Sequence, residues 1–234
     1  MRYAAAILAG GVGRRMDQTV PKQFIDLNGR PLITWTLRPF LVVGLYRPVV
    51  VAIHPDWLDH MRRILAAQGW ERSVDVVPGG ATRQESAFHV IQALEGALSP
   101  SDRLLIHDAA RCLVSPDLLD RCRAALTQHE AVTATVPSVD TIARVADGRV
   151  TEIPPRQALH QVQTPQGFAF GLIREAHLAA LRDGVADVSD DAGLVLRLGR
   201  VVQVVPGDPS NIKVSRPADL TLAATLLGSA GPAS

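Results

Sequence analysis

The fold of this chain is read most directly from the stretch Ile7-Leu-Ala-Gly-Gly-Val-Gly-Arg-Arg-Met16, which Pro21-Lys22-Gln23 follows closely. The apolar run over residues 4–8 predicts a buried strand, and this strand leads into a turn that contains three glycines. Glycines there permit positive φ angles and let a ligand approach the main chain without a Cβ in the way. Such a loop presents several N–H groups to phosphate oxygens. With two arginines and a lysine close behind, the stretch predicts a triphosphate-binding loop.

The spacing excludes the commoner phosphate-binding loops. A P-loop would continue with Gly-Lys-Ser or Gly-Lys-Thr, which is absent, and Met16 stands where the dinucleotide fingerprint needs another glycine. What remains is similar to the signature loop of the nucleotidyltransferases, which transfer a nucleoside monophosphate to a sugar or polyol phosphate. The alternative is a structural glycine turn flanked by solvated arginines.

Composition is that of an ordinary globular protein. The 234 residues suffice for one large α/β domain, with 47% hydrophobic and 20% charged residues. The net charge of +1 gives no general electrostatic reason to expect a nucleic acid or a membrane as partner. Cys112 and Cys122 lack a metal-binding spacing, so we expect reduced thiols in a cytoplasmic protein. We also expect neither secretion nor a membrane span, because the sequence shows no signal peptide and no long apolar stretch.

Apolar runs typical of strands alternate with helical patterns through most of the chain. We expect strands over residues 4–8, 49–53, 74–77 and 103–107, and helices over residues 32–40, 57–68, 84–98 and 116–129. This alternation predicts an α/β fold with a mostly parallel sheet and helices on both faces. Ligands bind outside the carboxyl ends of such strands, so the motifs that follow the strands are expected to share one site.

One region departs from the alternation. Residues 132–136, 141–145 and 150–153 predict three successive strands, with Asp147-Gly148 as a tight hairpin turn. A hairpin that projects from a parallel α/β core needs a surface to pack on, so we expect a dimerisation arm over about 137–158. The alternative is a hairpin that lies on its own domain. We expect a single domain over residues 1–227, with the arm inserted, and a disordered tail over residues 228–234.

Two further motifs follow predicted strands. In residues 78–86, two glycines permit close approach of a base or ribose, and Ser86 can hydrogen-bond it, although a serine there is also a common helix cap. Asp108 stands at the end of the strand over 103–107, and Arg111 follows three residues later. Such an aspartate commonly faces a metal–phosphate unit or a substrate hydroxyl, and the arginine can bind phosphate through two hydrogen bonds. The alternative is an internal ion pair between them, and we interpret His107 as structural.

Hydroxyl groups and cations of the kind that bind a small phosphorylated polyol recur later in the chain. They lie in Asp140-Thr141-Ile142, Arg156, Gln163-Thr164-Pro165-Gln166, Ser189-Asp190-Asp191-Ala192 and Asn211-Ile212-Lys213-Val214. Each segment alone could be a turn or a cap. Together they favour a polyol-phosphate site.

In this order, the motifs resemble the methylerythritol-phosphate cytidylyltransferases of isoprenoid biosynthesis and the related ribitol-phosphate cytidylyltransferases. The resemblance covers residues 3 to about 227 and rests on Gly-x-Gly-x-Arg-Met…Pro-Lys-Gln-Phe, Gly-Gly…Arg-x-x-Ser, His-Asp-Ala-Ala-Arg, Asp-Thr-Ile, Gln-Thr-Pro-Gln and Asn-Ile-Lys-Val. It implies a Rossmann-like nucleotidyltransferase fold whose protruding β-hairpin arm interlocks two subunits of a homodimer.

The resemblance also implies the reaction. CMP would pass from CTP to a polyol phosphate with release of pyrophosphate, the acceptor being 2-C-methyl-D-erythritol 4-phosphate. The alternatives are D-ribitol 5-phosphate or a related pentitol or sugar phosphate, and a degenerate homologue that binds nucleotide without catalysis.

A role for each site residue follows from the resemblance. Arg15 and Lys22 would be the catalytic pair. The nucleotide would contact Ala9, Gly10, Gly11, Gly13, Gly80, Ser86 and Asp108, with Mg²⁺ or another divalent cation held mainly by the CTP phosphates. The polyol phosphate would contact Asp108, Arg111, Thr141, Arg156, Thr164, Ser189 and Lys213, with Thr141 and Arg156 supplied by the arm of the neighbouring subunit.

Three positions depart from the family's pattern. Ser189 stands where threonine is usual and keeps the hydroxyl group. Cys112 replaces a common proline, which implies a looser backbone there, and Gly193 replaces a small polar residue and removes any hydroxyl contact at that point.

Overall fold

The first strand of the chain forms the middle of a seven-stranded sheet. The structure is a computed structural model that describes residues 1–11, 20–186 and 188–229. Strand β1 (Tyr3–Ala9) pairs in parallel with β6 (Arg103–Asp108) on one side and with β4 (Tyr46–Ile53) on the other. A central parallel strand is covered on both faces, which explains the unbroken apolar run in the sequence.

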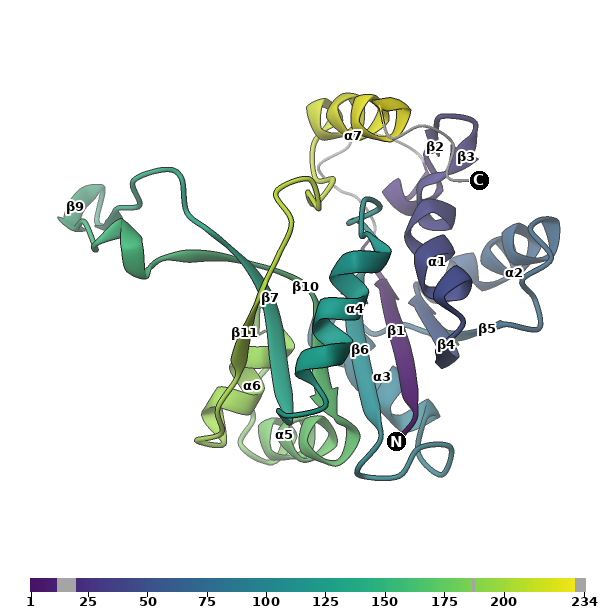
Figure 1. Ribbon diagram of the computed structural model, residues 1–234, viewed down its shortest axis with the longest axis horizontal. Coiled ribbons are helices and arrows are strands. Elements are labelled where there is room, and N and C mark those ends of the chain that lie inside the picture. Colours follow the sequence, from purple (N-terminus) through teal and green to yellow (C-terminus); the bar gives the residue numbers. More distant parts are fainter. Residues whose placement is uncertain (12–19, 187, 230–234) are drawn as a thin grey trace.

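Helices cover both faces of this sheet (Figure 1). One layer comprises α1 (Leu32–Val43), α2 (Leu58–Ala67) and α4 (Pro116–Ala125). The other comprises α3 (Arg83–Ala93), α5 (Phe170–Arg182) and α6 (Asp191–Arg197).

Strand β1 supplies both hydrophobic cores. Ala5, Ile7 and Ala9 pack with the first helix layer. Ala4, Ala6 and Leu8 pack with the second. Successive side chains of a strand point to opposite faces, so one short apolar run fills two cores at once.

The sheet has the order β11-β7-β10-β6-β1-β4-β5. The strands not yet introduced are β5 (Val74–Pro78), β7 (Ala131–Pro137), β10 (His160–Ala169) and β11 (Gln203–Pro206). Neighbouring strands are parallel except at β10, which is antiparallel to both β6 and β7. The predicted α/β fold, a mostly parallel sheet flanked by helices, is therefore confirmed. The sequence pattern does not predict β10, because this strand is defined by its return from the hairpin rather than by its own periodicity.

Two helices are shorter than their patterns predict. Helix α3 ends at Ala93 rather than near residue 98, and Gly96 turns the chain after it with a φ of +81°. Helix α4 ends at Ala125 rather than near residue 129. Leu98 and Leu126 lie beyond these ends and are still buried, so the apolar pattern continues past the last helical turn.

The predicted hairpin is present and extends away from the sheet between β7 and β10 (Figure 1). It comprises β8 (Arg144–Ala146), β9 (Arg149–Glu152) and the short helix η3 (Arg156–Ala158). Asp147 and Gly148 turn the chain with φ angles of +49° and +73°, the two positive values of a tight hairpin turn. The strand predicted from residue 141 begins only at Arg144.

The last helix, α7 (Pro217–Ser229), packs beside the small hairpin of β2 (Asp26–Leu27) and β3 (Arg30–Pro31). It includes Gly228 and Ser229, which the sequence assigns to the tail, whereas residues 230–234 lie outside the described part. Two short 3-10 helices, η1 (Lys22–Phe24) and η2 (Pro55–Trp57), complete the fold. Within the described ranges, no helix is both long and apolar enough to cross a membrane.

Candidate functional site

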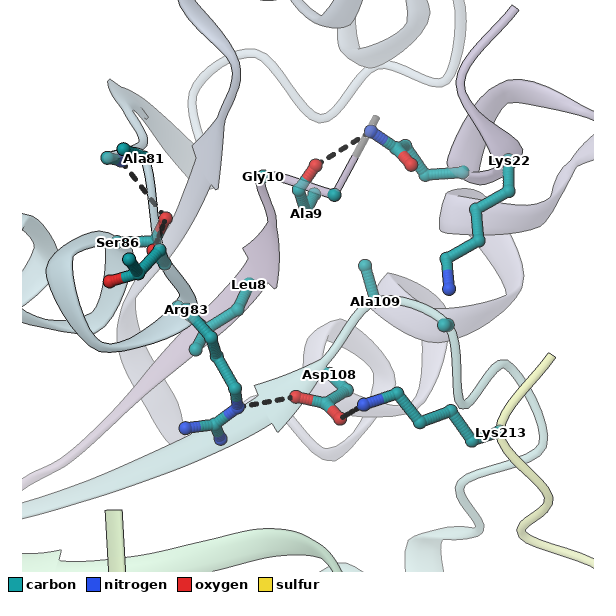
Figure 2. Close-up of a pocket in the computed structure, with 15 residues that line it drawn as sticks. Leu8, Ala9, Gly10, Lys22, Ala81, Arg83, Ser86, Asp108, Ala109 and Lys213 are labelled. Atoms are coloured by element: carbon teal, nitrogen blue, oxygen red, sulfur yellow. Dashed lines mark hydrogen bonds and ion pairs between the residues drawn. The ribbon is translucent and has the colours of Figure 1, made fainter. Parts of the chain in front are cut away.

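A cavity opens at the carboxyl ends of β1 and β6, where the sequence predicts a shared site (Figure 2). Its lining includes the predicted site residues Ala9, Gly10, Gly11, Lys22, Gly80, Ser86, Asp108 and Lys213. Gly13 and Arg15 lie outside the described residues. The fold thus brings together the beginning, the middle and the end of the chain at one edge of the sheet.

The glycine segment before α3 forms one wall of the cavity. Ser86 Oγ accepts a hydrogen bond from Gly80 N–H (3.0 Å) and donates one to the Thr82 carbonyl (2.9 Å). A Cβ on Gly10 would lie 2.9 Å from Ser86 Oγ, so the loop after β1 can approach this segment because glycine lacks a side chain. Since its hydrogen is given to Thr82, the Ser86 hydroxyl can only accept a hydrogen bond from a ligand.

Lys22 is positioned by its neighbours in η1. Gln23 is buried and its Nε2 donates to the Ala9 carbonyl at 2.7 Å, which ties η1 to the end of β1. The Phe24 ring packs against the Trp57 ring, with centroids 5.3 Å apart. Directly before these two residues in the chain, Lys22 extends its ammonium group to the Val214 carbonyl (3.0 Å), next to Lys213. The helix η1 therefore delivers a cation to the edge of the cavity (Figure 2).

Asp108 lies at the end of β6 between two cations. Its Oδ1 accepts from Arg83 Nε at 3.1 Å, and its Oδ2 lies 2.6 Å from Lys213 Nζ (Figure 2). Burial alone would raise the pKa of the Asp108 carboxyl, but the charges of Arg83 and Lys213 outweigh burial and hold that pKa well below its usual range. The sequence allows an ion pair between Asp108 and Arg111; instead, the ion-pair partners of Asp108 are Arg83 and Lys213.

Arg83 connects this carboxylate to a second one. Its Nη1 donates to Asp191 Oδ2 at 2.6 Å, and Asp191 Oδ1 lies 3.0 Å from His177 Nε2. Burial would lower the pKa of the Arg83 guanidinium, but Asp191 and Asp108 outweigh that effect and raise it. The guanidinium is therefore permanently charged. A row of charged and polar side chains runs from the exposed Lys213 through Asp108 and Arg83 to the fully buried Asp191 and His177.

His107 has the structural role that the sequence suggests. Its side chain is fully buried, and burial lowers its pKa to about 4, so it is neutral at pH 7. His107 Nε2 lies 3.1 Å from the Arg111 carbonyl, which can only accept, so Nε2 carries the hydrogen. His107 Nδ1 then accepts from the Thr164 hydroxyl (2.9 Å), which in turn accepts from Asp108 N–H (3.0 Å). Thr164 thereby fixes the backbone at Asp108, and its contact with an acceptor stays a prediction.

Arg111 faces a second cavity that shares Lys213 with the first. The Arg111 guanidinium donates to the Asn211 carbonyl (2.8 Å) and to the Val162 carbonyl (3.2 Å). Its Nε is buried without a hydrogen-bond partner, and it forms no ion pair with any residue that the structure describes. Burial lowers its pKa, as expected for a cation without a carboxylate at contact distance. This arrangement suits an incoming anion.

Three of the predicted acceptor contacts lie away from the first cavity. Thr141 and Arg156 belong to the exposed hairpin, where Arg156 donates to the Val139 carbonyl at 3.0 Å. Ser189 is exposed on the segment that precedes α6. A single copy of the chain therefore does not bring the hairpin residues to the cavity.

Two residues of the site, Arg83 and Asp191, have no functional role predicted from the sequence. Both stand in quoted motifs, Arg83 in Gly-Gly…Arg-x-x-Ser and Asp191 directly after Ser189-Asp190. An arginine or an aspartate near the start of a helix is ordinarily solvated, and only the fold shows that these two meet across 108 residues of chain. No local pattern carries that information.

Asp108 is the carboxylate that could hold a divalent cation in this cavity. Hard cations prefer oxygen ligands and often use one or two carboxylates together with substrate phosphates. The described residues contain no cluster of three or more His, Cys, Asp or Glu side chains that could bind a metal by themselves. Asp108 Oδ2 becomes available when the Lys213 ammonium moves, so the donor set fits a cation that arrives with a polyphosphate.

The sequence matches the family model described as 2-C-methyl-D-erythritol 4-phosphate cytidylyltransferase (IspD) over residues 3–229. It is 40% identical over 233 residues to a protein of that name from Thermobifida fusca, covering 97% of this chain and 93% of that one. It is 42% identical to one from Synechococcus sp. (strain CC9902), covering 95% and 96% of the two chains.

Solved structures agree with the sequence comparison. The crystal structure of 2-C-methyl-D-erythritol 4-phosphate cytidylyltransferase from Thermus thermophilus is similar with a TM-score of 0.76 and 34% identity, over 97% of this chain and 100% of that one. A 4-diphosphocytidyl-2C-methyl-D-erythritol synthase from Anaerococcus prevotii is similar with a TM-score of 0.82 and 28% identity, over 97% and 99%.

Proposed function

Because the chain belongs to the family of 2-C-methyl-D-erythritol 4-phosphate cytidylyltransferases, we propose a role for each group in its two cavities. The protein is a CTP-dependent nucleotidyltransferase of isoprenoid precursor biosynthesis. It transfers CMP from CTP to 2-C-methyl-D-erythritol 4-phosphate and releases pyrophosphate. The observation that carries the assignment of roles is the convergence of Lys22, Lys213 and Asp108 on the glycine-lined cavity.

The nucleotide occupies the first cavity. Main-chain groups of Ala9, Gly10 and Gly11 lie along its triphosphate, and Gly13 and Arg15, which are outside the described residues, are assigned to the same ligand. The cytidine lies against Gly80 and Ser86, whose hydroxyl accepts a hydrogen bond from the base. The support is the close approach of the two glycine segments at Ser86, where a Cβ on Gly10 would lie 2.9 Å from Ser86 Oγ.

The phosphate of the acceptor lies between Lys213 and Arg111. These two cations line the second cavity, and Lys213 also lines the first, so a phosphate held there adjoins the nucleotide. The absence of an ion pair at Arg111, within the part of the chain that the structure describes, supports an anion as its natural partner. Ser189 supplies a hydroxyl group, Thr164 holds the backbone at Asp108, and Asp108 lies between nucleotide and acceptor.

The reaction joins two anions, and the protein overcomes their repulsion with fixed positive charge. An acceptor phosphate oxygen attacks the α-phosphorus of CTP, and the bond between that phosphorus and the oxygen that bridges to the β-phosphate breaks. The electron pair leaves with pyrophosphate, so no protein nucleophile is required. Lys22, together with Arg15, stabilises the charge that grows on the α-phosphoryl oxygens, while Lys213 and Arg111 orient the attacking phosphate.

A divalent cation, Mg²⁺ in the first instance, would be held mainly by the CTP phosphates with Asp108 as its protein ligand. When bound, it would neutralise charge on the phosphates and on the leaving pyrophosphate. Asp108 stays ionised for this purpose, because the Arg83 guanidinium outweighs burial and lowers its pKa.

The protruding hairpin is a dimerisation arm of a homodimer. Val139, Ile142, Val145, Val150 and Ile153 on this arm are all at least 46% exposed. Exposed apolar side chains gathered on one projecting element are typical of a surface that a partner covers. In the dimer, Thr141 and Arg156 of one subunit would reach the acceptor bound to the other.

A cytoplasmic location fits the two cysteines, which are both buried and free. Burial raises the pKa of the Cys112 thiol to about 11 and that of the Cys122 thiol to about 12, so both stay protonated and unreactive.

The experiment that tests the function is a substrate panel with pyrophosphate release as the readout. CTP, UTP, GTP and ATP are each combined with 2-C-methyl-D-erythritol 4-phosphate or D-ribitol 5-phosphate. We expect the highest kcat/KM for CTP with the methylerythritol phosphate. A higher kcat/KM with ribitol phosphate would contradict the assignment of the acceptor, and CTP binding without pyrophosphate release from any pair would contradict catalysis.

A further inference from the structure

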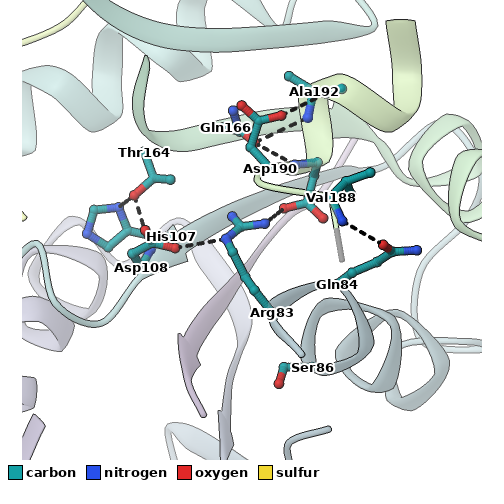
Figure 3. Close-up of polar contacts among 12 residues, drawn as sticks. Arg83, Gln84, Ser86, His107, Asp108, Thr164, Gln166, Val188, Asp190 and Ala192 are labelled. Carbon is teal, nitrogen blue, oxygen red and sulfur yellow. Dashed lines mark hydrogen bonds and ion pairs between the residues drawn. The ribbon is translucent and has the colours of Figure 1, made fainter. Parts of the chain in front are cut away.

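The first turn of α3 touches both halves of the site. The segment before it, residues 78–82, forms the wall that we assign to the nucleotide. Gln84 and Arg83, in the turn itself, reach across to the segment that carries Ser189 (Figure 3). The three contacts of this bridge involve Val185, Val188 and Asp191.

Gln84 holds this segment through two backbone groups. Its Nε2 donates to the Val185 carbonyl at 2.9 Å. Its Oε1 accepts from Val188 N–H at 3.1 Å, as Figure 3 shows. The Gln84 side chain is 6% exposed, so water does not readily replace either contact. The side-chain amide of Gln84 thus bonds one backbone carbonyl and one backbone N–H in the residues before Ser189.

Arg83 holds the other end of the same segment. It is bonded to Asp191, two residues after Ser189, and to Asp108 at the end of β6. Asp191 is also held by two other residues. Its N–H donates to Gln166 Oε1 at 3.1 Å, and its carboxylate forms a hydrogen bond with His177. The segment cannot shift without breaking contacts to a buried guanidinium that is also bonded to Asp108.

We propose that Gln84 and Arg83 are positioning residues. They hold the acceptor-binding segment around Ser189 at a fixed position relative to the nucleotide-binding segment before α3. The proposal rests on the function proposed above for Ser189 and Asp108. In this proposal, the first turn of α3 fixes the distance between the two bound substrates. Gln84 and Arg83 affect acceptor binding without contacting the acceptor.

The first test compares Gln84→Ala with Gln92→Ala, a matched change at an exposed position of the same helix. Two hydrogen bonds of ordinary strength correspond to about a tenfold change in an equilibrium constant. We therefore expect the KM for 2-C-methyl-D-erythritol 4-phosphate to rise about tenfold in Gln84→Ala, while the KM for CTP stays within about twofold. Gln92→Ala should change neither constant.

A second readout is independent of turnover. The Val188 amide is protected by its bond to Gln84, so hydrogen exchange in the peptide that covers residues 185–191 should be faster in Gln84→Ala than in the wild type or in Gln92→Ala. Hydrogen exchange can also be measured in a variant that folds but has no activity.

Arg83→Lys completes the test. Lysine keeps the positive charge, but it lacks the planar guanidinium group through which Arg83 bonds two carboxylates at once. We expect its KM for the acceptor to rise as well. Because both residues act on one segment, the combined variant should show less than the product of the two single effects.

Equal rises in both KM values, or an unchanged acceptor KM together with unchanged exchange in residues 185–191, would overturn the proposal. The proposal would also be overturned if the acceptor KM of the combined variant rose by the full product of the two single increases. If the wild-type protein releases pyrophosphate with the methylerythritol phosphate and the variants behave as it does, this inference alone fails. If the wild type does not turn that acceptor over, the proposed function fails instead.

Discussion

At the scale of single residues, the fold gathers the cations Lys22, Arg83 and Lys213 at one cavity. Gln23 and Phe24 hold the helix η1, and this helix places Lys22 at the edge of the cavity. Arg83 and Lys213 occupy the two oxygens of Asp108. Positive charge that is already gathered at a site needs little reorganisation when negative charge develops there.

Lys22→Ala tests the role of this cation in catalysis. Its loss removes one positive charge that is assigned to the α-phosphate, and the loss of one such donor costs on the order of 10²–10³ in rate. We expect kcat to fall by about that factor while the circular dichroism spectrum stays unchanged. A near-normal kcat in this variant would remove Lys22 from the mechanism.

Asp108 also affects how stability depends on pH. Its pKa is depressed in the folded protein, so its ion pairs stabilise the fold above the ordinary aspartate pKa of about 4, and this contribution is lost as the pH falls further. We expect Asp108→Asn to lower the free energy of unfolding at pH 7 by about 1.5–3 kcal/mol. The wild type and the variant should converge as the pH falls below about 4. Urea unfolding at several pH values measures both effects, and a constant difference down to the lowest pH would contradict the account.

At the scale of elements, two glycine segments from different strands form one wall. The loop after β1 and the loop after β5 meet at Ser86, whose hydroxyl would have to give up its hydrogen bonds with Gly80 and Thr82 to move away from a new Cβ on Gly10. The site therefore depends on how closely two elements approach each other as well as on which side chains they carry.

Gly10→Ala should weaken CTP binding because its Cβ would lie 2.9 Å from Ser86 Oγ. The Ser86 Cβ is 3.9 Å away, which is an ordinary contact, so Ser86→Ala should relieve the clash. We expect Gly10→Ala to raise the Kd for CTP about tenfold in the wild type, but by much less when it is added to Ser86→Ala, which lacks the clashing oxygen. Calorimetric titration with CTP provides the measurement, and an equal tenfold loss in the two backgrounds would contradict this explanation.

The sequence predicts those elements whose pattern is local. The apolar run of β1 and the Asp147-Gly148 turn are recognised from neighbouring residues, and the structure has both. Strand β10 is not recognised, because its antiparallel position depends on partners that lie 23 to 66 residues away in the sequence. The same holds for the site. Ala9, Lys22, Asp108 and Lys213 are predicted from motifs and do meet, whereas the bridge from Arg83 to Asp191 exists only in the folded chain.

At the scale of the whole molecule, the account requires two subunits. Thr141 and Arg156 of the arm line neither cavity of their own chain, and the apolar residues of the arm are exposed in a single copy. An acceptor site that is completed by the partner would make activity depend on the dimer.

Subunit mixing tests this dependence. A Lys22→Ala subunit keeps an intact arm, and an Arg156→Ala subunit keeps an intact cavity, so a mixed dimer has one complete site if the arm acts on its partner. Random exchange at equal amounts should then restore about a quarter of the wild-type activity, since half of the dimers are mixed and each has one of two sites. Activity that stays at the level of the two parents would place Arg156 in its own subunit's site or make it structural.

The most direct measurement of the central claim is a crystal structure with CTP and Mg²⁺ bound. The account predicts the triphosphate along Gly10 and Gly11, with Lys22 Nζ moved from the Val214 carbonyl to within hydrogen-bond distance of an α-phosphate oxygen and Arg15 on the same phosphate. A nucleotide bound elsewhere, or one at this wall with Lys22 and Arg15 both turned away from it, would contradict the account.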